Sequence, residues 1–120
     1  MDKRRSTRRL ANGISLSLKS LDPQVWFRFW NSGDYTLKDI SLVGLGVSFK
    51  DRMPEGTCLS LELKMGNSPY SVRIFGRVEW IKQEENKQYR AGVSFSWWKD
   101  DKDRNMVCRY IENLPLLAAS

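Results

Sequence analysis

Apolar and polar residues alternate in six short stretches of the chain, and this alternation predicts strands that bury one face. The stretches span residues 25–30, 35–41, 42–49, 58–65, 71–81 and 89–97. Clusters of turn-forming residues separate them, as in NSGD (31–34) and DRMPEG (51–56). Such a pattern indicates an antiparallel barrel or sandwich. Six strands in so short a chain favour the closed barrel, because closure removes exposed sheet edges.

The alternation also predicts which side chains form the core. The expected inward-facing residues are Val25, Phe27, Phe29, Val43, Leu45, Val47, Phe49, Leu59, Leu61, Leu63, Met65, Val72, Ile74, Val78, Trp80, Tyr89, Ala91, Val93, Phe95 and Trp97. The intervening residues are mostly small or charged and are expected to face solvent.

The period changes near the end of the chain. In residues 100–115 the apolar positions Val107, Tyr110, Ile111 and Leu114 follow the spacing of one helix face. Acidic residues precede this stretch and Pro115 follows it, which is typical of a helix start and a helix end. We expect one amphipathic helix that packs against the barrel.

Residues 10–24 (LANGISLSLKSLDPQ) alternate only weakly and end at Asp22-Pro23. We interpret them as an arm or linker, although ISLSL leaves a short edge strand as an alternative. The predicted organisation is one domain, with a flexible basic arm over residues 1–22 and a barrel with its helix over residues 23–120.

Positive charge is concentrated in the first nine residues. The net charge of the chain is +6, and residues 1–9 contain five basic side chains and one acidic side chain. The rest of the chain is therefore close to neutral. A short basic segment of this kind indicates an anionic partner such as a nucleic acid, an anionic lipid or a phosphorylated small molecule.

The composition argues against an enzyme. The chain contains no His, and its two cysteines, Cys58 and Cys108, have no CxxC partner, which argues against a zinc site and a His-based triad. No phosphate-binding Gly-rich loop with a Lys is present. We expect no cofactor. No stretch has the apolar length of a membrane span or a secretory signal, so we expect a cytoplasmic protein.

Two motifs remain. In RRSTRR, Arg5 and Arg9 are four residues apart, as are Arg4 and Arg8. Arginine can hold a phosphate or a guanine edge through two parallel bonds and can stack on a base.

The second motif is DISLVG, in which three residues form D-x-S-x-x-G, namely Asp39, Ser41 and Gly44. Alone, this motif is equally consistent with a strand end, where Asp and Ser bond to nearby backbone and Gly bends the chain.

Together the two motifs resemble the signature of the PilZ domain family. The sequences GRVEW (76–80) and YRAGVSF (89–95) resemble the last two barrel strands of that family. The resemblance covers essentially the whole chain and implies a six-stranded antiparallel β-barrel with a C-terminal helix. One departure concerns the residues between Arg9 and the stretch 25–30. Either the first strand is GISLSL, or this stretch is an insertion.

The family's usual ligand is cyclic di-GMP, so the resemblance implies a binding site for it. It assigns Arg5 and Arg9 to phosphates and guanines, and Asp39 to the pairing edge of guanine. Ser41 would bond to guanine or nearby backbone, and Gly44 would permit close approach of the ligand. An Arg at position 4 is associated in the family with two intercalated ligand molecules instead of one.

The resulting prediction is a non-enzymatic receptor that orders its arm on binding and signals to a downstream protein of a motility, biofilm or polysaccharide system. Trp26, Trp30 and Trp98 are candidates for the partner surface, with core packing as the alternative. Two other functions stay open: a degenerate adaptor that binds protein only, and a nucleic-acid-binding barrel. The near-neutral body argues against the latter, because such barrels carry basic strands.

Overall fold

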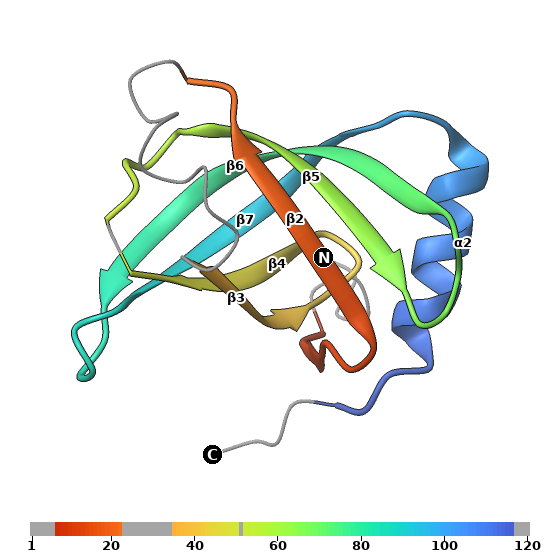
Figure 1. Cartoon of the computed structure of the whole chain (residues 1–120), viewed down its shortest axis with the longest axis horizontal. Helices are drawn as coiled ribbons and strands as arrows, with labels where there is room; N and C mark the ends of the chain where they lie inside the picture. The colour runs from red at the N-terminus through yellow and green to blue at the C-terminus, as the bar shows by residue number, and fades with distance from the viewer. Residues whose placement is uncertain (1–6, 23–34, 51, 117–120) are drawn as a thin grey trace.

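A computed structural model describes residues 7–22, 35–50 and 52–116 of the chain. These residues form one curled antiparallel sheet and one helix (Figure 1). The elements are β1 (Arg9–Leu10), β2 (Ile14–Ser20), β3 (Tyr35–Ile40), β4 (Gly44–Phe49), β5 (Cys58–Met65), β6 (Ser71–Gln83), β7 (Tyr89–Trp98) and α2 (Asp101–Glu112). The strand order in the sheet is β1-β3-β4-β7-β6-β5-β2.

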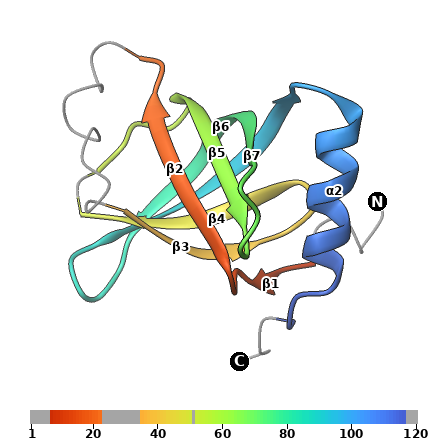
Figure 2. The same cartoon turned by 45° about the vertical axis from the view of Figure 1, so that its right-hand side comes forward.

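The sheet curls into a half-barrel, which confirms the predicted mostly β antiparallel fold with a C-terminal helix. The described part of the chain contains five of the six predicted strands, together with β2 and the two-residue β1, which adds an edge next to β3. The other edge, β2, crosses in front of β3 and β4 (Figures 1 and 2). The backbone N–H of Leu18 in β2 donates to the hydroxyl of Tyr35 in β3 at 3.1 Å. The Tyr35 side chain thus links β2 and β3, which form no backbone ladder with each other in the described part of the sheet.

The strand β2 resolves the ambiguity over residues 10–24. Ile14–Ser20 pair with β5 over their whole length, so the linker interpretation of these residues was wrong and the strand alternative holds. Leu18 lies in the core, and Ile14 and Leu16 pack against it. Burial of these alternate residues stabilises the strand despite its many serines. The predicted strand at 25–30, with Val25, Phe27 and Phe29, lies outside the described residues, as do Trp26 and Trp30.

The core lies between the concave face of the sheet and α2. It contains Leu18, Ile40, Leu45, Val47, Phe49, Met53, Leu59, Leu61, Leu63, Met65, Val72, Ile74, Val78, Ala91, Val93, Val107, Ile111 and Leu114. Most inward-facing predictions are therefore confirmed. Each large side chain buried in this way stabilises the fold by about 2 kcal/mol. Val43 is an exception: it lies in the turn between β3 and β4 and is 39% exposed.

Two bulges reverse the facing of two predicted core residues. Glu79 is an additional residue in β6, because Val78 pairs with Val93 and Trp80 pairs with Gly92. Trp80 therefore faces outward and is 41% exposed. A second irregularity at Ser96 in β7 turns Trp97 outward, where it stacks on Phe75 at 5.0 Å and is 48% exposed. A bulge shifts the inward and outward alternation by one residue, and the local sequence pattern does not reveal it.

The helix follows the predicted pattern of packing, whereas Trp98, a candidate for the partner surface, takes the alternative of core packing. Trp98 packs against the core and meets Phe95 edge to face, with ring centres 5.4 Å apart. Asp100 caps α2 by accepting from the backbone N–H of Asp103 at 2.8 Å. Val107 and Ile111 are buried, so the helix covers one end of the half-barrel (Figure 2). Among the described residues, no helix has the length and apolar character that a membrane crossing requires.

Candidate functional site

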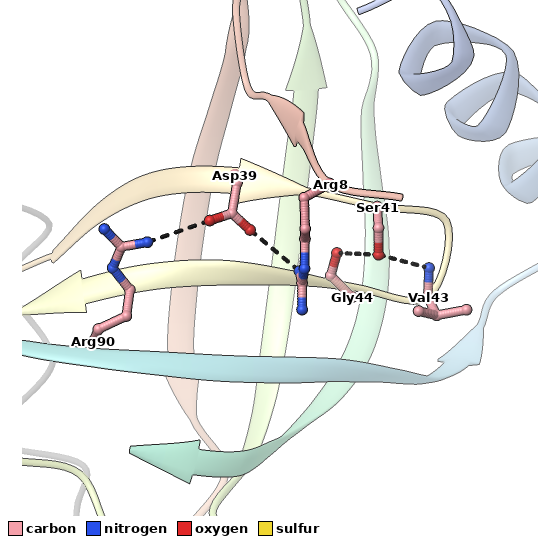
Figure 3. Close-up of polar contacts among 6 residues, drawn as sticks. All are labelled: Arg8, Asp39, Ser41, Val43, Gly44 and Arg90. Atoms are coloured by element: carbon pink, nitrogen blue, oxygen red, sulfur yellow. Dashed lines mark hydrogen bonds and ion pairs between the residues drawn. The ribbon is translucent and has the colours of Figure 1, made fainter. Parts of the chain in front are cut away.

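The carboxylate of Asp39 lies between two guanidinium groups on the outer face of the sheet (Figure 3). Its Oδ1 accepts from Nη1 of Arg8 at 3.2 Å, and its Oδ2 accepts from Nη1 of Arg90 at 3.3 Å. The Asp39 side chain is only 10% exposed. Two partners on separate oxygens offset the cost of removing this charge from water.

A bulge and a glycine explain how Asp39 reaches this position. Lys38 is an additional residue in β3, because Leu37 pairs with Val47 and Asp39 pairs with Gly46. Ile40 then points into the core, and Asp39 points outward over Gly46. A Cβ at Gly46 would lie 2.8 Å from Oδ2 and 2.9 Å from Oδ1 of Asp39. The absence of a side chain at Gly46 therefore allows the carboxylate to lie flat on the strand.

Ser41 and Gly44 shape the turn that follows β3. The Ser41 hydroxyl donates to the carbonyl of Gly44 at 3.3 Å and accepts from the backbone N–H of Val43 at 3.3 Å. A Cβ at Gly44 would lie 2.2 Å from the carbonyl oxygen of Val93 in β7. Both residues thus have structural contacts that hold the hairpin and bring β4 close to β7. These contacts correspond to the strand-end alternative for the D-x-S-x-x-G motif.

Arg8 and Arg9 point to different parts of the molecule. Arg8 reaches Asp39, whereas Nη1 of Arg9 donates to the carbonyl of Leu114, after α2, at 2.9 Å. The neighbouring Leu10 N–H donates to the carbonyl of Pro115 at 2.9 Å. Strand β1 therefore lies between β3 and the end of the helical segment (Figure 2). Arg4 and Arg5 lie outside the described residues.

Arg90 connects Asp39 to the β6–β7 hairpin. Its Nε lies 3.5 Å from Oε1 of Glu84, and the same Oε1 accepts from the hydroxyl of Ser48 at 3.1 Å. The side chains of Arg90 and Glu84 are 27% and 29% exposed. Two hydrogen bonds and one ion pair therefore connect Ser48 to Asp39 through Glu84 and Arg90.

Trp80 lies on the same outer face of the sheet as Asp39. The register aligns Trp80, Gly92, Gly46 and Asp39 across four neighbouring strands, and we call these four residues the outer row. The indole of Trp80 lies over Gly92, since a Cβ there would overlap its Nε1 and Cε2 atoms. Three strand spacings separate the ends of the row, or about 14 Å between the backbones of Trp80 and Asp39.

The arrangement suits a flat, anionic ligand that carries hydrogen-bond donors. The more exposed guanidinium, that of Arg8, can bind phosphate, the carboxylate can accept N–H groups, and the exposed indole offers a stacking face. Sequence reasoning singled out Asp39 but missed Arg90, Gly46 and Trp80 as site residues. Arg8 was visible only as the second member of the alternative Arg4–Arg8 spacing. The bulge at Glu79 hid Trp80, and Gly46 carried no signal beyond its small size.

Comparison with protein-family models matches the PilZ domain over residues 2–113. Neither the search of curated proteins nor that of solved structures found a match. The matched range spans nearly the whole chain and includes both motifs, all the described strands and α2. This chain belongs to the PilZ domain family.

Proposed function

We propose that this chain is a non-enzymatic receptor for cyclic di-GMP, with its site on the outer face of β3, β4 and β7. The PilZ family is known for binding this ligand, and its members are generally non-catalytic receptors. The observation that carries the proposal is the nearly buried Asp39 carboxylate, which lies flat over Gly46 between two arginines. Such a carboxylate is suited to accept the donors on the pairing edge of guanine.

Asp39 retains the capacity to accept from a ligand while its arginines are bound. An ionised carboxylate has about four lone-pair sites, and Arg8 and Arg90 occupy one on each oxygen. Guanine presents N1–H and the 2-amino group side by side, which match the two oxygens of a carboxylate. The phosphates of the ligand would be bound by arginines through charge-assisted bonds.

The contacts of the arginines favour a different R-x-x-x-R pair from the one that the sequence suggested. We propose that Arg4 and Arg8 contact the ligand, because Arg8 already lies at Asp39. Arg9 instead donates to the carbonyl of Leu114, after α2 and away from Asp39, which argues for a structural role. The original assignment to Arg5 and Arg9 stays a prediction that the same experiment tests. Binding of a second ligand molecule through Arg4 also stays a prediction.

Other residues would complete the pocket. Ser41 and Gly44 hold the hairpin that carries Asp39, and their predicted ligand contacts would come from this turn. Trp80 would stack on a guanine at the other end of the outer row, because an indole face is a favourable partner for a nucleobase.

Ligand binding would be relayed to a downstream protein of a motility, biofilm or polysaccharide system through the N-terminal segment. The support for this route is the position of β1, which contacts β3 at Asp39 and the backbone of Pro115. A shift of Arg8 toward a phosphate would strain these contacts. A pure protein adaptor remains the alternative function if no nucleotide binds.

Isothermal titration calorimetry with cyclic di-GMP tests the proposal, with GTP and single-stranded DNA as control ligands. We expect saturable binding of cyclic di-GMP only, and the stoichiometry reports whether a second molecule binds. Absence of binding by the wild-type chain would overturn the receptor function. Titration of the DNA instead would favour the nucleic-acid-binding alternative.

The variants Arg8→Ala and Arg9→Ala decide between the two arginine spacings. We expect Arg8→Ala to weaken binding by at least about tenfold, as for loss of a charge-assisted hydrogen bond. Arg9→Ala should retain most of the affinity but lower the melting temperature, because it loses the bond to Leu114. The opposite order of effects would restore the assignment to Arg5 and Arg9.

A further inference from the structure

We infer that Arg90 is a positioning residue that sets the direction of the Asp39 carboxylate and thereby the selectivity of the site for guanine. The inference rests on the proposed function, and it concerns a residue outside both sequence motifs. It follows from the contacts of Arg90, from its burial and from the charges that surround it.

Arg90 is held at two points of its guanidinium group. Nη1 donates a hydrogen bond to Oδ2 of Asp39 at 3.3 Å, and Nε forms an ion pair, without a hydrogen bond, with Oε1 of Glu84 at 3.5 Å. Glu84 is itself held, because its Oε1 accepts from the Ser48 hydroxyl at 3.1 Å and its backbone N–H donates to the carbonyl of Gln88 at 2.7 Å. A planar guanidinium fixed in this way holds its partner in one orientation.

The charges around Arg90 argue against a role in binding phosphate. Two carboxylates, Asp39 and Glu84, surround its single positive charge. In addition, its Nε atom is buried beyond the reach of a ligand. Arg8 differs in both respects, since it forms an ion pair with one carboxylate, that of Asp39, and its side chain is 37% exposed. Arg8 is therefore the guanidinium suited to contact a phosphate, and Arg90 is suited to hold Asp39.

This division of roles has a consequence for binding. When a phosphate draws Arg8 from Oδ1, the Arg90 contact keeps Asp39 in place over Gly46. The two donors of guanine are then met by a carboxylate whose plane is already set. Preorganisation of this kind matters most for a paired contact, because both hydrogen bonds require the same orientation.

The test compares cyclic di-GMP with cyclic di-IMP, whose hypoxanthine bases lack the 2-amino group that Asp39 would read. Affinities of the wild-type chain, Arg90→Lys and Glu84→Gln are measured by calorimetry at several salt concentrations. Glu85→Gln serves as the matched control, because Glu85 lies on the same turn, is exposed and has no place in these contacts. Thermal unfolding of each variant verifies that it is folded.

We expect the wild-type chain to prefer cyclic di-GMP by about tenfold or more, the value of one good bidentate contact. Arg90→Lys keeps the charge but not the planar fork, so the preference should fall by severalfold while the salt dependence of affinity stays unchanged. Glu84→Gln should reduce the preference to a smaller extent, because it retains an acceptor for Ser48 but loses the charge beside Arg90. Glu85→Gln should match the wild-type chain.

Other outcomes would overturn the inference. An equal loss of affinity for both ligands, with a shallower salt dependence, would identify Arg90 as a phosphate contact. An unchanged preference in both variants would show that Arg90 does not position Asp39. If the wild-type chain bound neither ligand, the proposed function itself would fail and the inference with it. If it bound both ligands equally, Asp39 would not read the 2-amino group.

Discussion

Gly46 illustrates how one residue without a side chain makes room for a charged group. The Asp39 carboxylate occupies the space that a Cβ at Gly46 would require, with both oxygens within 3.0 Å of that position. Sequence reasoning placed Gly46 among the small outward-facing residues of its strand and gave it no function. Gly46 belongs to the site because it pairs with Asp39 on the neighbouring strand.

Gly46→Ala should displace the Asp39 carboxylate and weaken cyclic di-GMP binding by at least about tenfold, because the contact depends on orientation. The fold should lose only about 1 kcal/mol, since alanine fits a strand and the overlap is with a side chain that can move. Calorimetry and urea unfolding measure the two effects. Ser17→Ala, on the exposed face of β2, is the control for substitution on the outer surface. Unchanged affinity in Gly46→Ala would contradict the assigned role of Asp39.

The helix α2 depends on its first turn. Asp100 accepts from the backbone N–H of Asp103, and Asp101 and Asp103 add negative charge near the helix N-terminus. The apolar positions Val107 and Ile111 then bury one face against the sheet. Capping and periodicity are both local properties, which explains why this element could be predicted from the sequence.

Asp100→Ala should lower the free energy of unfolding by about 1 kcal/mol, the usual cost of losing an N-cap side chain. Asp100→Asn retains an oxygen acceptor and should remain within a few tenths of a kcal/mol of the wild-type chain. Urea unfolding followed by circular dichroism compares the three proteins. Equal losses for both substitutions would mean that the charge of Asp100, and not its capping bond, stabilises the helix.

The half-barrel brings together strands that are distant in the ladder. Tyr35 in β3 accepts from the backbone N–H of Leu18 in β2, although these strands lie near opposite edges of the sheet. The bond gives a partner to a backbone donor at the edge of β2 and links the two sides of the curled sheet. A tyrosine hydroxyl thus replaces the backbone hydrogen bond that pairing of β2 with β3 would provide, since these described strands do not pair.

Tyr35→Phe should destabilise the protein by about 1 kcal/mol, because it leaves the Leu18 N–H without its partner and keeps the aromatic ring. Tyr70→Phe is the matched control, since Tyr70 is strongly exposed and should tolerate loss of its hydroxyl. Thermal unfolding and amide hydrogen exchange at Leu18 provide the measurement. Identical exchange rates in wild type and Tyr35→Phe would contradict a link between β2 and β3.

The distribution of charge over the whole chain predicts how binding responds to salt. Residues 1–9 contain five of the chain's 20 basic side chains, and the remainder of the chain is nearly balanced. Affinity for cyclic di-GMP should therefore decrease as salt increases, since exposed charges are screened within about 10 Å at 0.1 M. Arg8→Ala should make this decrease shallower. Affinity that did not change with salt would identify stacking, as on Trp80, as the main contribution.

Much of the fold and part of the site could be predicted from the chain alone. The strands Cys58–Met65 and Tyr35–Ile40 and the helix Asp101–Glu112 follow from hydrophobic spacing and turn residues, because burial of one face depends on local periodicity. Asp39 was identified through its motif and lies at the centre of the site. The family resemblance, based on the motif residues, agrees with the match to the PilZ domain.

The rest depended on contacts between distant parts of the chain. Trp80 faces outward because a bulge forms where β6 meets β7, and residues 14–20 form a strand because β5 offers an edge to pair with. Arg8, and not Arg9, reaches Asp39 because β1 pairs with β3 and with the end of the helical segment. Periodicity and motifs specify which residue types are present and where strands form. Cross-strand register specifies which side chains meet, because it joins residues that no local pattern relates.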